Sequence, residues 1–340
     1  SITFAQVYDI ARNTGAYLVE QLGVDRTPVA VFAGRKMVTP AYFLGVAYAG
    51  RPYAPIDASL PDKRIEKILE NLCPRAIVAD RESLEHVESI VDELAKAEGF
   101  DRPQIFVAED ISRFEQVACA DSNCKISESA GDDVTDSEND TDGGVVAGCA
   151  GKTDDSSLDM LAAVRRQMSM TDPLYIIYTS GSTGNPKGVM TSHLSLMTYI
   201  NAYCDVMHIE ESDVLGNQSP LDYIAAIRDI YLPLKTGCST AIIPKEYFME
   251  PNALFDYMND KKVSSVGWSV SAFTILTSLG AFEEVGLKSL RKICFSGSVM
   301  PCRVLRKWQE NLPEAHFVNQ YGPTEATASC TYYSVDHTVE

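Results

Sequence analysis

One stretch of the chain gathers small hydrogen-bonding residues around a single cation: residues 178–188, YTSGSTGNPKG. Its glycines let a backbone approach a ligand closely, and its hydroxyls and amides can donate hydrogen bonds to phosphate oxygens. Lys187 adds a point charge of the kind that binds polyphosphates. The stretch therefore indicates a phosphate-binding loop, whose donors are Thr179, Ser180, Gly181, Ser182, Thr183 and Gly184.

The spacing of this stretch is not that of the P-loop, G-x-x-x-x-G-K-[ST]. Pro186 stands where that motif has its second glycine, and Lys187 is followed by Gly188 instead of a hydroxyl that could bind magnesium. Glycine, serine, threonine, asparagine and proline also make ordinary surface turns. A polar turn without a ligand is therefore the alternative interpretation.

A second stretch, residues 319–327 with the sequence NQYGPTEAT, also follows an apolar run. Tyr321 offers an aromatic face for a base, Thr324 a hydroxyl, and Glu325 a carboxylate that can hold a hard cation such as Mg²⁺. The two stretches together are typical of a nucleoside triphosphate site.

Length and composition limit the protein classes that fit. A chain of 340 residues favours two subdomains over one. No apolar run reaches the roughly 18 residues of a membrane helix, and the N-terminus does not resemble a signal peptide. A net charge of -18 argues against nucleic acid as a partner. Nine cysteines without a CxxC pair or zinc-type spacing predict reduced thiols, a cytoplasmic location and no metal cluster of cysteines.

An acidic segment interrupts the chain at residues 119–157. Between Asp121 and Asp159 there are eleven acidic residues and two lysines, which is half of the net charge. The segment has few large apolar residues, so we expect a disordered loop inserted between residues 1–118 and 158–340. A cation or partner site is the alternative, but the spacing of a calcium-binding loop is not met.

On either side of this segment, short β-branched runs alternate with amphipathic stretches. This alternation predicts an α/β fold with two mostly parallel sheets flanked by helices, whose ligands bind beyond the carboxyl ends of the strands. The expected strands are residues 28–33, 75–80, 103–108, 174–179, 239–244, 263–269, 291–297 and 316–322, and the expected helices include residues 4–22, 40–50, 62–72, 82–97 and 194–204.

Residues 178–188 and 319–327 resemble the two most diagnostic motifs of the adenylate-forming superfamily. This superfamily includes acyl-CoA synthetases, nonribosomal peptide synthetase adenylation domains and luciferases. Residues 47–65, AYAGRPYAPIDASLPDKRI, are similar to a motif of the amino-acid-activating branch. Residues 216–237 and 293–301 look most like D-alanine:D-alanyl carrier protein ligases. The resemblance runs from about Phe4 to Tyr333, apart from the acidic segment.

The resemblance implies ATP-dependent activation of a small carboxylic or amino acid, followed by transfer to the phosphopantetheine thiol of an acyl or peptidyl carrier protein. It implies ATP and Mg²⁺ as cofactors. The loop from Thr179 to Lys187 would contact the β- and γ-phosphates, Thr324 the α-phosphate, and Glu325 the Mg²⁺ ion. Asn319, Gln320, Tyr321, Gly322 and Pro323 would hold AMP, with Gly297, Ser298 and Val299 on the other face of adenine. The acid pocket would involve Asp222, Ile224, Ser296, Ala328 and His193.

Two positions of the acid pocket depart from the family pattern. Ile224 stands where the amino-acid branch has the aspartate that pairs with the substrate ammonium, and isoleucine cannot balance a buried charge. Asp222 lies two residues upstream and could replace it only with a shift of the backbone. The Cys-Gly-Glu of the D-alanine ligases is here Ser296, Gly297 and Ser298. The substrate is therefore an amino acid bound differently, or an acid without an α-amino group.

The chain ends before the family's ribose-binding motif and small C-terminal domain, whose lysine completes the active site. Ser1 in place of methionine favours a piece cut from a longer protein over a naturally short relative. We expect weak ATP binding and little activity from this piece alone. An acyl-CoA ligase and a degenerate, non-catalytic nucleotide-binding homologue are the alternative functions.

Overall fold

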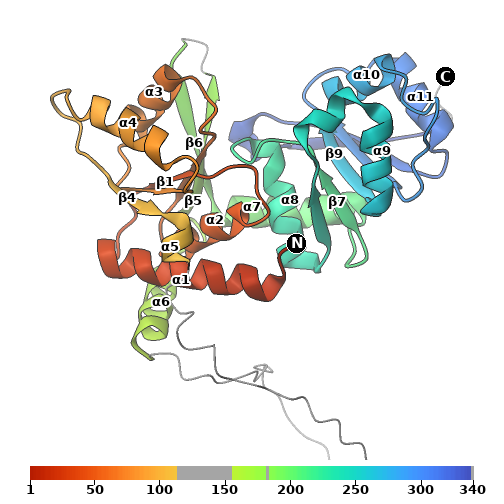
Figure 1. Ribbon diagram of the computed structural model, residues 1–340. Coiled ribbons are helices and arrows are strands. Elements are labelled where there is room, and N and C mark those ends of the chain that lie inside the picture. Colours follow the sequence, from red (N-terminus) through yellow and green to blue (C-terminus); the bar gives the residue numbers. More distant parts are fainter. Residues whose placement is uncertain (113–154, 181–183, 338–340) are drawn as a thin grey trace, which may run out of the picture.

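The fold consists of two six-stranded sheets, each flanked by helices, in a computed structural model that describes residues 1–112, 155–180 and 184–337 (Figure 1). The predicted architecture of two mostly parallel sheets is confirmed. The acidic segment lies outside the described residues, except that residues 155–157 begin helix α6.

The first sheet has the strand order β4-β3-β1-β2-β5-β6. Its strands run parallel, except that β6 pairs antiparallel with β5. Residues before the acidic segment supply β1 to β4, and residues after it complete the sheet. The strands are β1 (Val29–Phe32), β2 (Tyr53–Ile56), β3 (Ala76–Ala79), β4 (Gln104–Val107), β5 (Pro173–Ser180) and β6 (Pro186–Ser192).

The second sheet has the order β12-β11-β10-β9-β7-β8. It is parallel except for β12, which pairs antiparallel with β11. Each sheet therefore ends in one hairpin, and each hairpin carries one of the two motifs noted above between its strands. The strands are β7 (Val214–Asn217), β8 (Ser239–Ile242), β9 (Ser265–Ser269), β10 (Lys292–Ser296), β11 (His316–Tyr321) and β12 (Thr331–Val335).

Helices cover the sheets, so their central strands are buried on both faces and appear in the sequence as continuous apolar runs. All four residues of β1 are buried, for example. The helices are α1 (Phe4–Leu22), α2 (Thr39–Tyr48), α3 (Asp62–Leu72), α4 (Leu84–Leu94), α5 (Ala108–Ile111), α6 (Asp155–Gln167), α7 (His193–Met207), α8 (Ile227–Thr236), α9 (Pro251–Asp260), α10 (Val270–Ser278) and α11 (Cys302–Asn311). Short 3₁₀ turns are η1 (Ile224–Ala226), η2 (Lys245–Met249) and η3 (Thr324–Ala326).

An N-terminal cap and an apolar face explain why two of the helices form where they do. Thr3 caps α1, because its hydroxyl accepts from the Gln6 amide while the Gln6 side chain accepts from the Thr3 amide. Helix α3 buries one apolar face, made by Ile65, Ile68, Leu69 and Leu72, against the first sheet.

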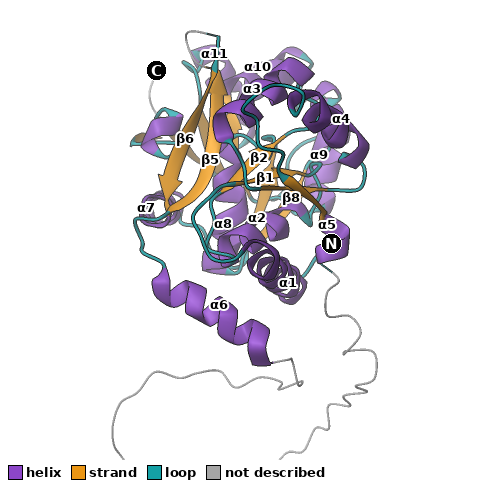
Figure 2. Cartoon of the chain, turned by 90° about the vertical axis from the view of Figure 1, so that its left-hand side faces the viewer, coloured by secondary structure: helices purple, strands orange, loops and turns teal. Residues whose placement is uncertain are grey.

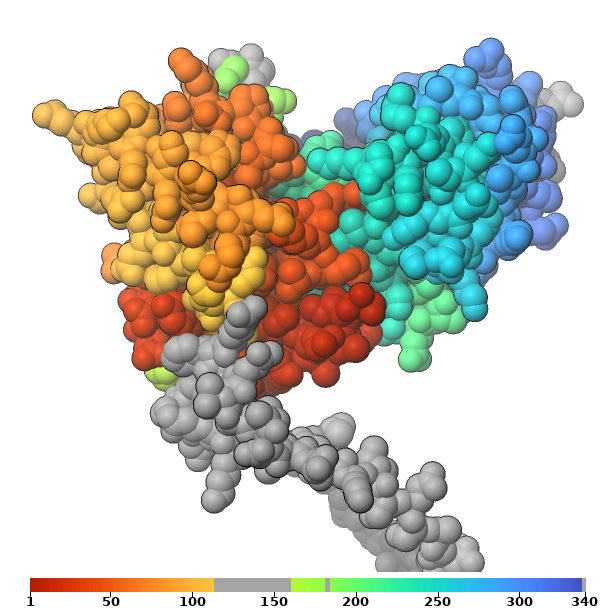
Figure 3. Space-filling model, viewed as in Figure 1, coloured from red at the N-terminus to blue at the C-terminus, as the bar shows by residue number. Residues whose placement is uncertain are grey.

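The two sheet units form two lobes, coloured orange and blue in Figure 3, with a hollow between them at the top of that view. Each expected strand and each expected helix is present, with shifts of a few residues at the ends. The strands β2, β6, β7 and β12 and the helices α5, α6 and α8 to α11 were not predicted from the sequence.

Candidate active site

The β5–β6 hairpin carries the glycine- and hydroxyl-rich loop. In its ladder Thr179 lies opposite Lys187 and Ser180 lies opposite Pro186, so the hydroxyls and the lysine meet at the end of the hairpin. Gly188 has no room for a side chain, because an added Cβ would lie 2.9 Å from Ile176 Cγ2. Gly184 has a positive φ of 78°. The predicted loop residues Gly181, Ser182 and Thr183 lie outside the described residues.

Helix α3 holds this end of the hairpin from one side. The Tyr178 hydroxyl donates to Asn71 Oδ1 at 2.9 Å, and Lys67 Nζ donates to Asn185 Oδ1 at 3.1 Å. Lys187 is exposed, and the Thr179 hydroxyl lies 3.5 Å from its carbonyl oxygen. The ammonium of Lys187 is therefore accessible to an anion at the loop.

The carboxyl ends of β10 and β11 meet because the two strands are parallel and in register, with Phe295 opposite Asn319. Beyond them lies a cavity of 610 Å³, which we call the β10–β11 cavity. Tyr321 at its edge is 71% exposed, so its ring is free to stack on a flat ligand. Eight of the residues predicted from the sequence line the cavity: Gly297, Ser298, Val299, Asn319, Gln320, Tyr321, Gly322 and Pro323.

The turn between β11 and β12 has a tightly specified backbone. A Cβ at Gly322 would lie 2.4 Å from Ser329 Cα, so only glycine fits there. Thr327 and Ala328 both have positive φ angles, 54° and 71°. The buried Gln320 side chain accepts from the Ser329 hydroxyl at 3.2 Å and braces the turn. This backbone fixes η3, and with it the position of Thr324.

The two motif loops meet in a second cavity of 340 Å³, which we call the shared cavity. Thr179 and Ser180 reach it from the first sheet, and Thr324 reaches it from the second. Because Pro323 lines the β10–β11 cavity and Thr324 lines the shared cavity, the two cavities adjoin at this peptide. An extended ligand can therefore lie across both.

Asp222 and Ile224 have different surroundings. Ile224 is 6% exposed and packs in the main apolar core, whereas Asp222 lines the shared cavity. Burial and the nearby Asp57 carboxylate raise the pKa of Asp222, although Lys245 opposes the effect. Lys245 itself lies 3.8 Å from Asp57. Asp222 therefore presents a carboxylate at the shared cavity, whereas Ile224, which stands at the position of the family's aspartate, does not.

The remaining predicted pocket residues lie apart from the shared cavity. His193 begins α7 at the end of the hairpin opposite the loop (Figure 2), where its amide donates to the Asp172 carbonyl oxygen at 3.2 Å. Burial lowers the pKa of His193. Ser296 is the last residue of β10, and Ala328 packs on the core. The structure does not bring His193 to the loop of the hairpin, and its role in the acid pocket stays a prediction.

Three charged side chains near the loops were not proposed as site residues from the sequence. Arg64 lines the shared cavity, and Asp57 and Arg35 lie with Asp222 around a small adjoining space. Asp57 and Arg64 belong to the motif at residues 47–65, which could have drawn attention to them. No sequence motif points to Arg35, because its guanidinium binds backbone carbonyl oxygens of residues distant in sequence.

Glu325, the predicted metal ligand, is exposed on η3 and makes no hydrogen bond or ion pair with another described residue. Among residues 1–112, 155–180 and 184–337 there is no cluster of three histidine, cysteine or acidic side chains that could hold a metal alone. A single carboxylate suits Mg²⁺, which commonly binds one or two carboxylates together with substrate phosphates.

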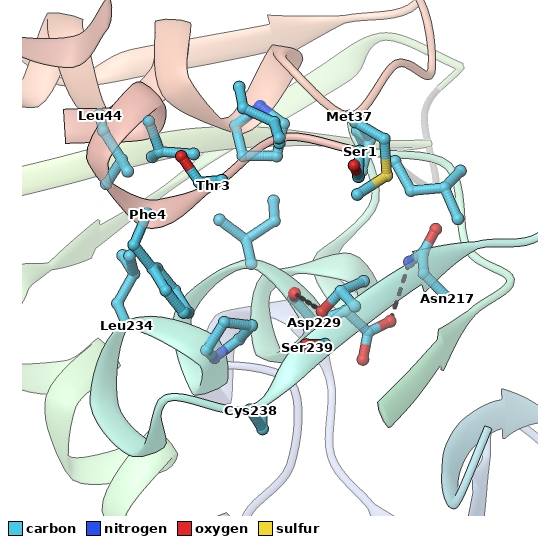
Figure 4. A pocket seen from close by; sticks show the side chains of 18 residues that line it. Ser1, Thr3, Phe4, Met37, Leu44, Asn217, Asp229, Leu234, Cys238 and Ser239 are labelled. Atoms are coloured by element: carbon cyan, nitrogen blue, oxygen red, sulfur yellow. Dashed lines mark hydrogen bonds between the residues drawn. The ribbon is translucent and has the colours of Figure 1, made fainter. Parts of the chain in front are cut away.

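A largely apolar cavity of 410 Å³ lies elsewhere, between α1, α2 and α8 (Figure 4). None of the described residues predicted as site residues lines it. Two of its polar side chains, Asn217 and Asp229, are hydrogen-bonded to each other at 2.8 Å. The predicted site residues therefore do not point to this cavity as the active site.

Two mostly parallel sheets, with an exposed aromatic ring at the end of one and a hydroxyl-rich loop at the end of the other, are typical of a nucleotide-binding protein. Over residues 1–340 the chain matches the AMP-binding enzymes, and it belongs to this family. The predicted membership of the adenylate-forming superfamily is thereby confirmed.

The curated relatives include D-alanine–D-alanyl carrier protein ligases. The chain is 28% identical over 331 residues to that of Bacillus cereus (strain AH187), an alignment that covers 97% of this chain and 55% of the relative. It is 26% identical over 336 residues to that of Bacillus licheniformis, covering 98% and 56%. The chain thus spans about half the length of the curated relatives it matches.

Solved structures show the same fold. The Vibrio cholerae adenylation domain AlmE, in complex with glycyl-adenosine-5'-phosphate, has a TM-score of 0.73 at 20% identity, covering 99% of this chain and 57% of AlmE. The N-terminal domain of FACL13 from Mycobacterium tuberculosis has a TM-score of 0.73 at 17% identity, covering 97% and 71%. No helix within the described ranges is both long and apolar enough to cross a bilayer.

Proposed function

We propose that the chain is the large nucleotide-binding part of an AMP-forming ligase, which activates a small amino acid as its acyl-adenylate. The observation that supports this most is the shared cavity, where Thr179 and Ser180 of one sheet meet Thr324 of the other. A flat base against Tyr321 and a triphosphate running past Thr324 to the hairpin would use both adjoining cavities.

In the proposed reaction the carboxylate oxygen of the acid attacks the α-phosphorus of ATP, and the bond to the bridging oxygen of pyrophosphate breaks. Negative charge accumulates on the phosphates, so donors are needed and a protein nucleophile is not. Thr324 would donate to the α-phosphate, and Thr179, Ser180 and Lys187 would bind the departing pyrophosphate. Gly297, Ser298 and Val299 would lie against the adenine face opposite Tyr321.

Glu325 would hold Mg²⁺, which neutralises phosphate charge when bound. Its carboxylate is exposed beside Thr324 and is not engaged by another described residue. Glu325 therefore fits a Mg²⁺ ion whose other ligands are phosphate oxygens. Through that ion, Glu325 would help to orient the triphosphate.

The acid would carry an ammonium group, which Asp222 binds in its charged form. A buried ammonium needs a carboxylate partner, and Asp222 is the only acidic residue among the described residues that line the shared cavity. The relatives named D-alanine–D-alanyl carrier protein ligases make D-alanine the first acid to test, and glycine the second.

The second step would transfer the acyl group to the thiol of a carrier protein, with release of AMP. The relatives' names support this acceptor, and their length supports a further C-terminal domain that completes the site. All six described cysteines are unpaired, which supports a cytoplasmic location as part of the proposal.

The test is ATP–pyrophosphate exchange by the full-length protein with a panel of small amino, hydroxy and keto acids. We expect exchange with one or a few small amino acids. Exchange only with acids that lack an amino group would contradict the role of Asp222. Nucleotide binding without any exchange would instead support the non-catalytic homologue, and transfer to CoA but not to a carrier protein would support an acyl-CoA ligase.

A further inference from the structure

Arg64, the third residue of α3, has an unpaired guanidinium at the shared cavity. Its Nε atom is shielded from solvent and has no hydrogen-bond partner among the described residues. No ion pair involving Arg64 is formed within the described part of the chain. A shielded donor without a partner is costly, and an anion bound at the shared cavity would supply the missing acceptor.

The neighbours of Arg64 on α3 show where it points. Residues 64, 67, 68 and 71 share one face of the helix because they are spaced by three and four. Lys67 and Asn71 bind Asn185 and Tyr178 of the hairpin, and Ile68 lines the shared cavity. The face of α3 that carries Arg64 is therefore the face that meets the hydroxyl-rich loop.

The charge around the cavity favours an anionic ligand beside Arg64. Arg64 is the only basic residue among the described residues that line the cavity. Two other arginines have a shielded Nε without a hydrogen-bond partner, and both have a carboxylate beside them: Arg51 binds Asp25, and Arg228 Nε lies 3.5 Å from Asp229 Oδ1. Lys187 lies opposite Thr179 on the exposed side of the hairpin. Arg64 and Lys187 therefore both lie at the end of the hairpin that carries Thr179 and Ser180.

We propose that Arg64 binds the β- and γ-phosphates of ATP and stabilises the pyrophosphate that leaves. This inference rests on the proposed function. As the bond from the α-phosphorus to the bridging oxygen breaks, that oxygen takes the electron pair, and the planar guanidinium can donate two hydrogen bonds to the new charge. Arg64 contacts the reacting polyphosphate and is a catalytic residue in this sense.

The first test uses ATP–pyrophosphate exchange by the full-length protein. Arg64→Met is expected to raise the KM for pyrophosphate by about tenfold or more, and Arg64→Lys to recover part of the loss. The KM for the acid should stay unchanged. Lys63→Met is the matched control, because it removes the same charge from an exposed neighbour. A rise in the KM for the acid alone, or equal losses for all substrates, would overturn the proposal.

The second test does not need activity. Magnesium pyrophosphate should raise the melting temperature of the wild type and of Lys63→Met, but not that of Arg64→Met. A similar rise in all three proteins, or no rise in the wild type, would refute the role of Arg64. A rise that depends on Arg64, with no exchange for any acid, would keep this inference and reject the proposed function.

Discussion

Arg35 joins the two sheet units through Asn217: its Nη2 lies 2.7 Å from both the backbone oxygen and the side-chain oxygen of Asn217. Arg35 also donates to the carbonyl oxygens of Ser219, at 3.3 Å, and of Ile243. Asn217 in turn donates to Asp229 at 2.8 Å (Figure 4). One side chain from the β1–α2 loop thus fixes the start of the segment that leads to Asp222.

The residues on either side of Arg35, Gly34 and Lys36, bind the first sheet unit instead of the second. The Gly34 amide and Lys36 Nζ both bind Asp80 Oδ2, at 2.9 and 3.0 Å, and Asp80 follows β3 of the first sheet. The loop is therefore anchored on one unit while Arg35 reaches the other. The position of Asp222 relative to the first sheet depends on this bridge.

We predict that Arg35→Lys loosens the segment around Asp222, because an ammonium cannot reproduce the fork of donors. The free energy of unfolding should fall by about 1.5–3 kcal/mol, the range for hydrogen bonds to charged groups. Amide hydrogens of residues 219–226 should exchange faster, as measured by mass spectrometry. Lys36→Gln, which breaks a contact inside the first unit, should not change that exchange; equal effects of both variants would contradict the bridge.

Asp222→Asn should abolish most activity with amino acids. Loss of the partner of a buried ammonium costs about 3 kcal/mol or more, which would appear in kcat/KM for the acid. In the wild type, kcat/KM should rise with pH as Asp222 ionises, at a pH above the ordinary carboxyl pKa of 3.8. The variant should lack this step. An unchanged pH profile would show that Asp222 does not bind the substrate.

The same substitution should stabilise the fold at neutral pH. The pKa of Asp222 is raised in the folded state, so folding favours the protonated form and the carboxylate destabilises the protein above that pKa. Asp222→Asn should therefore melt at a higher temperature near pH 7. The difference should disappear as the pH falls towards 3.8, and calorimetry over this range measures it.

Tyr321→Ala should weaken ATP binding without destabilising the fold. The ring is 71% exposed, and stacking of a base on an aromatic ring contributes about 1–3 kcal/mol. We expect the KM for ATP to rise about tenfold or more. Tyr332→Ala is the control, because this ring is 60% exposed on β12 and does not line the β10–β11 cavity. Equal effects of the two variants would argue against stacking on Tyr321.

Lys187→Ala should reduce the exchange rate about tenfold to 100-fold, since it removes a charge directed at the phosphates. The melting temperature should not change, because the side chain is exposed on the edge strand β6. Lys288→Ala, at an exposed position of the second unit, should leave the exchange rate unaltered. An unchanged rate in Lys187→Ala would remove this lysine from the phosphate site.

The strands β1, β3 and β10 could be predicted because they are buried on both faces, which makes each a short, mainly apolar run between polar turns. Strand β12 could not be predicted, because four of its five residues are exposed. It is stabilised by its antiparallel pairing with β11, which is a tertiary feature. Strand β6 was missed because glycine and proline at its start are typical of turns, while its pairing with β5 overrides that preference.

The sequence by itself determined the two motif loops and their chemistry, because glycines, hydroxyls, Tyr321 and Glu325 are local features of short stretches. Only the tertiary structure decided which side chains share a cavity. Thr179 and Thr324 meet because separate sheets end at the same hollow, and Asp222 faces that cavity while Ile224 enters the core. His193, Arg35 and Arg64 depend in the same way on contacts between residues far apart in the chain, which no local pattern encodes.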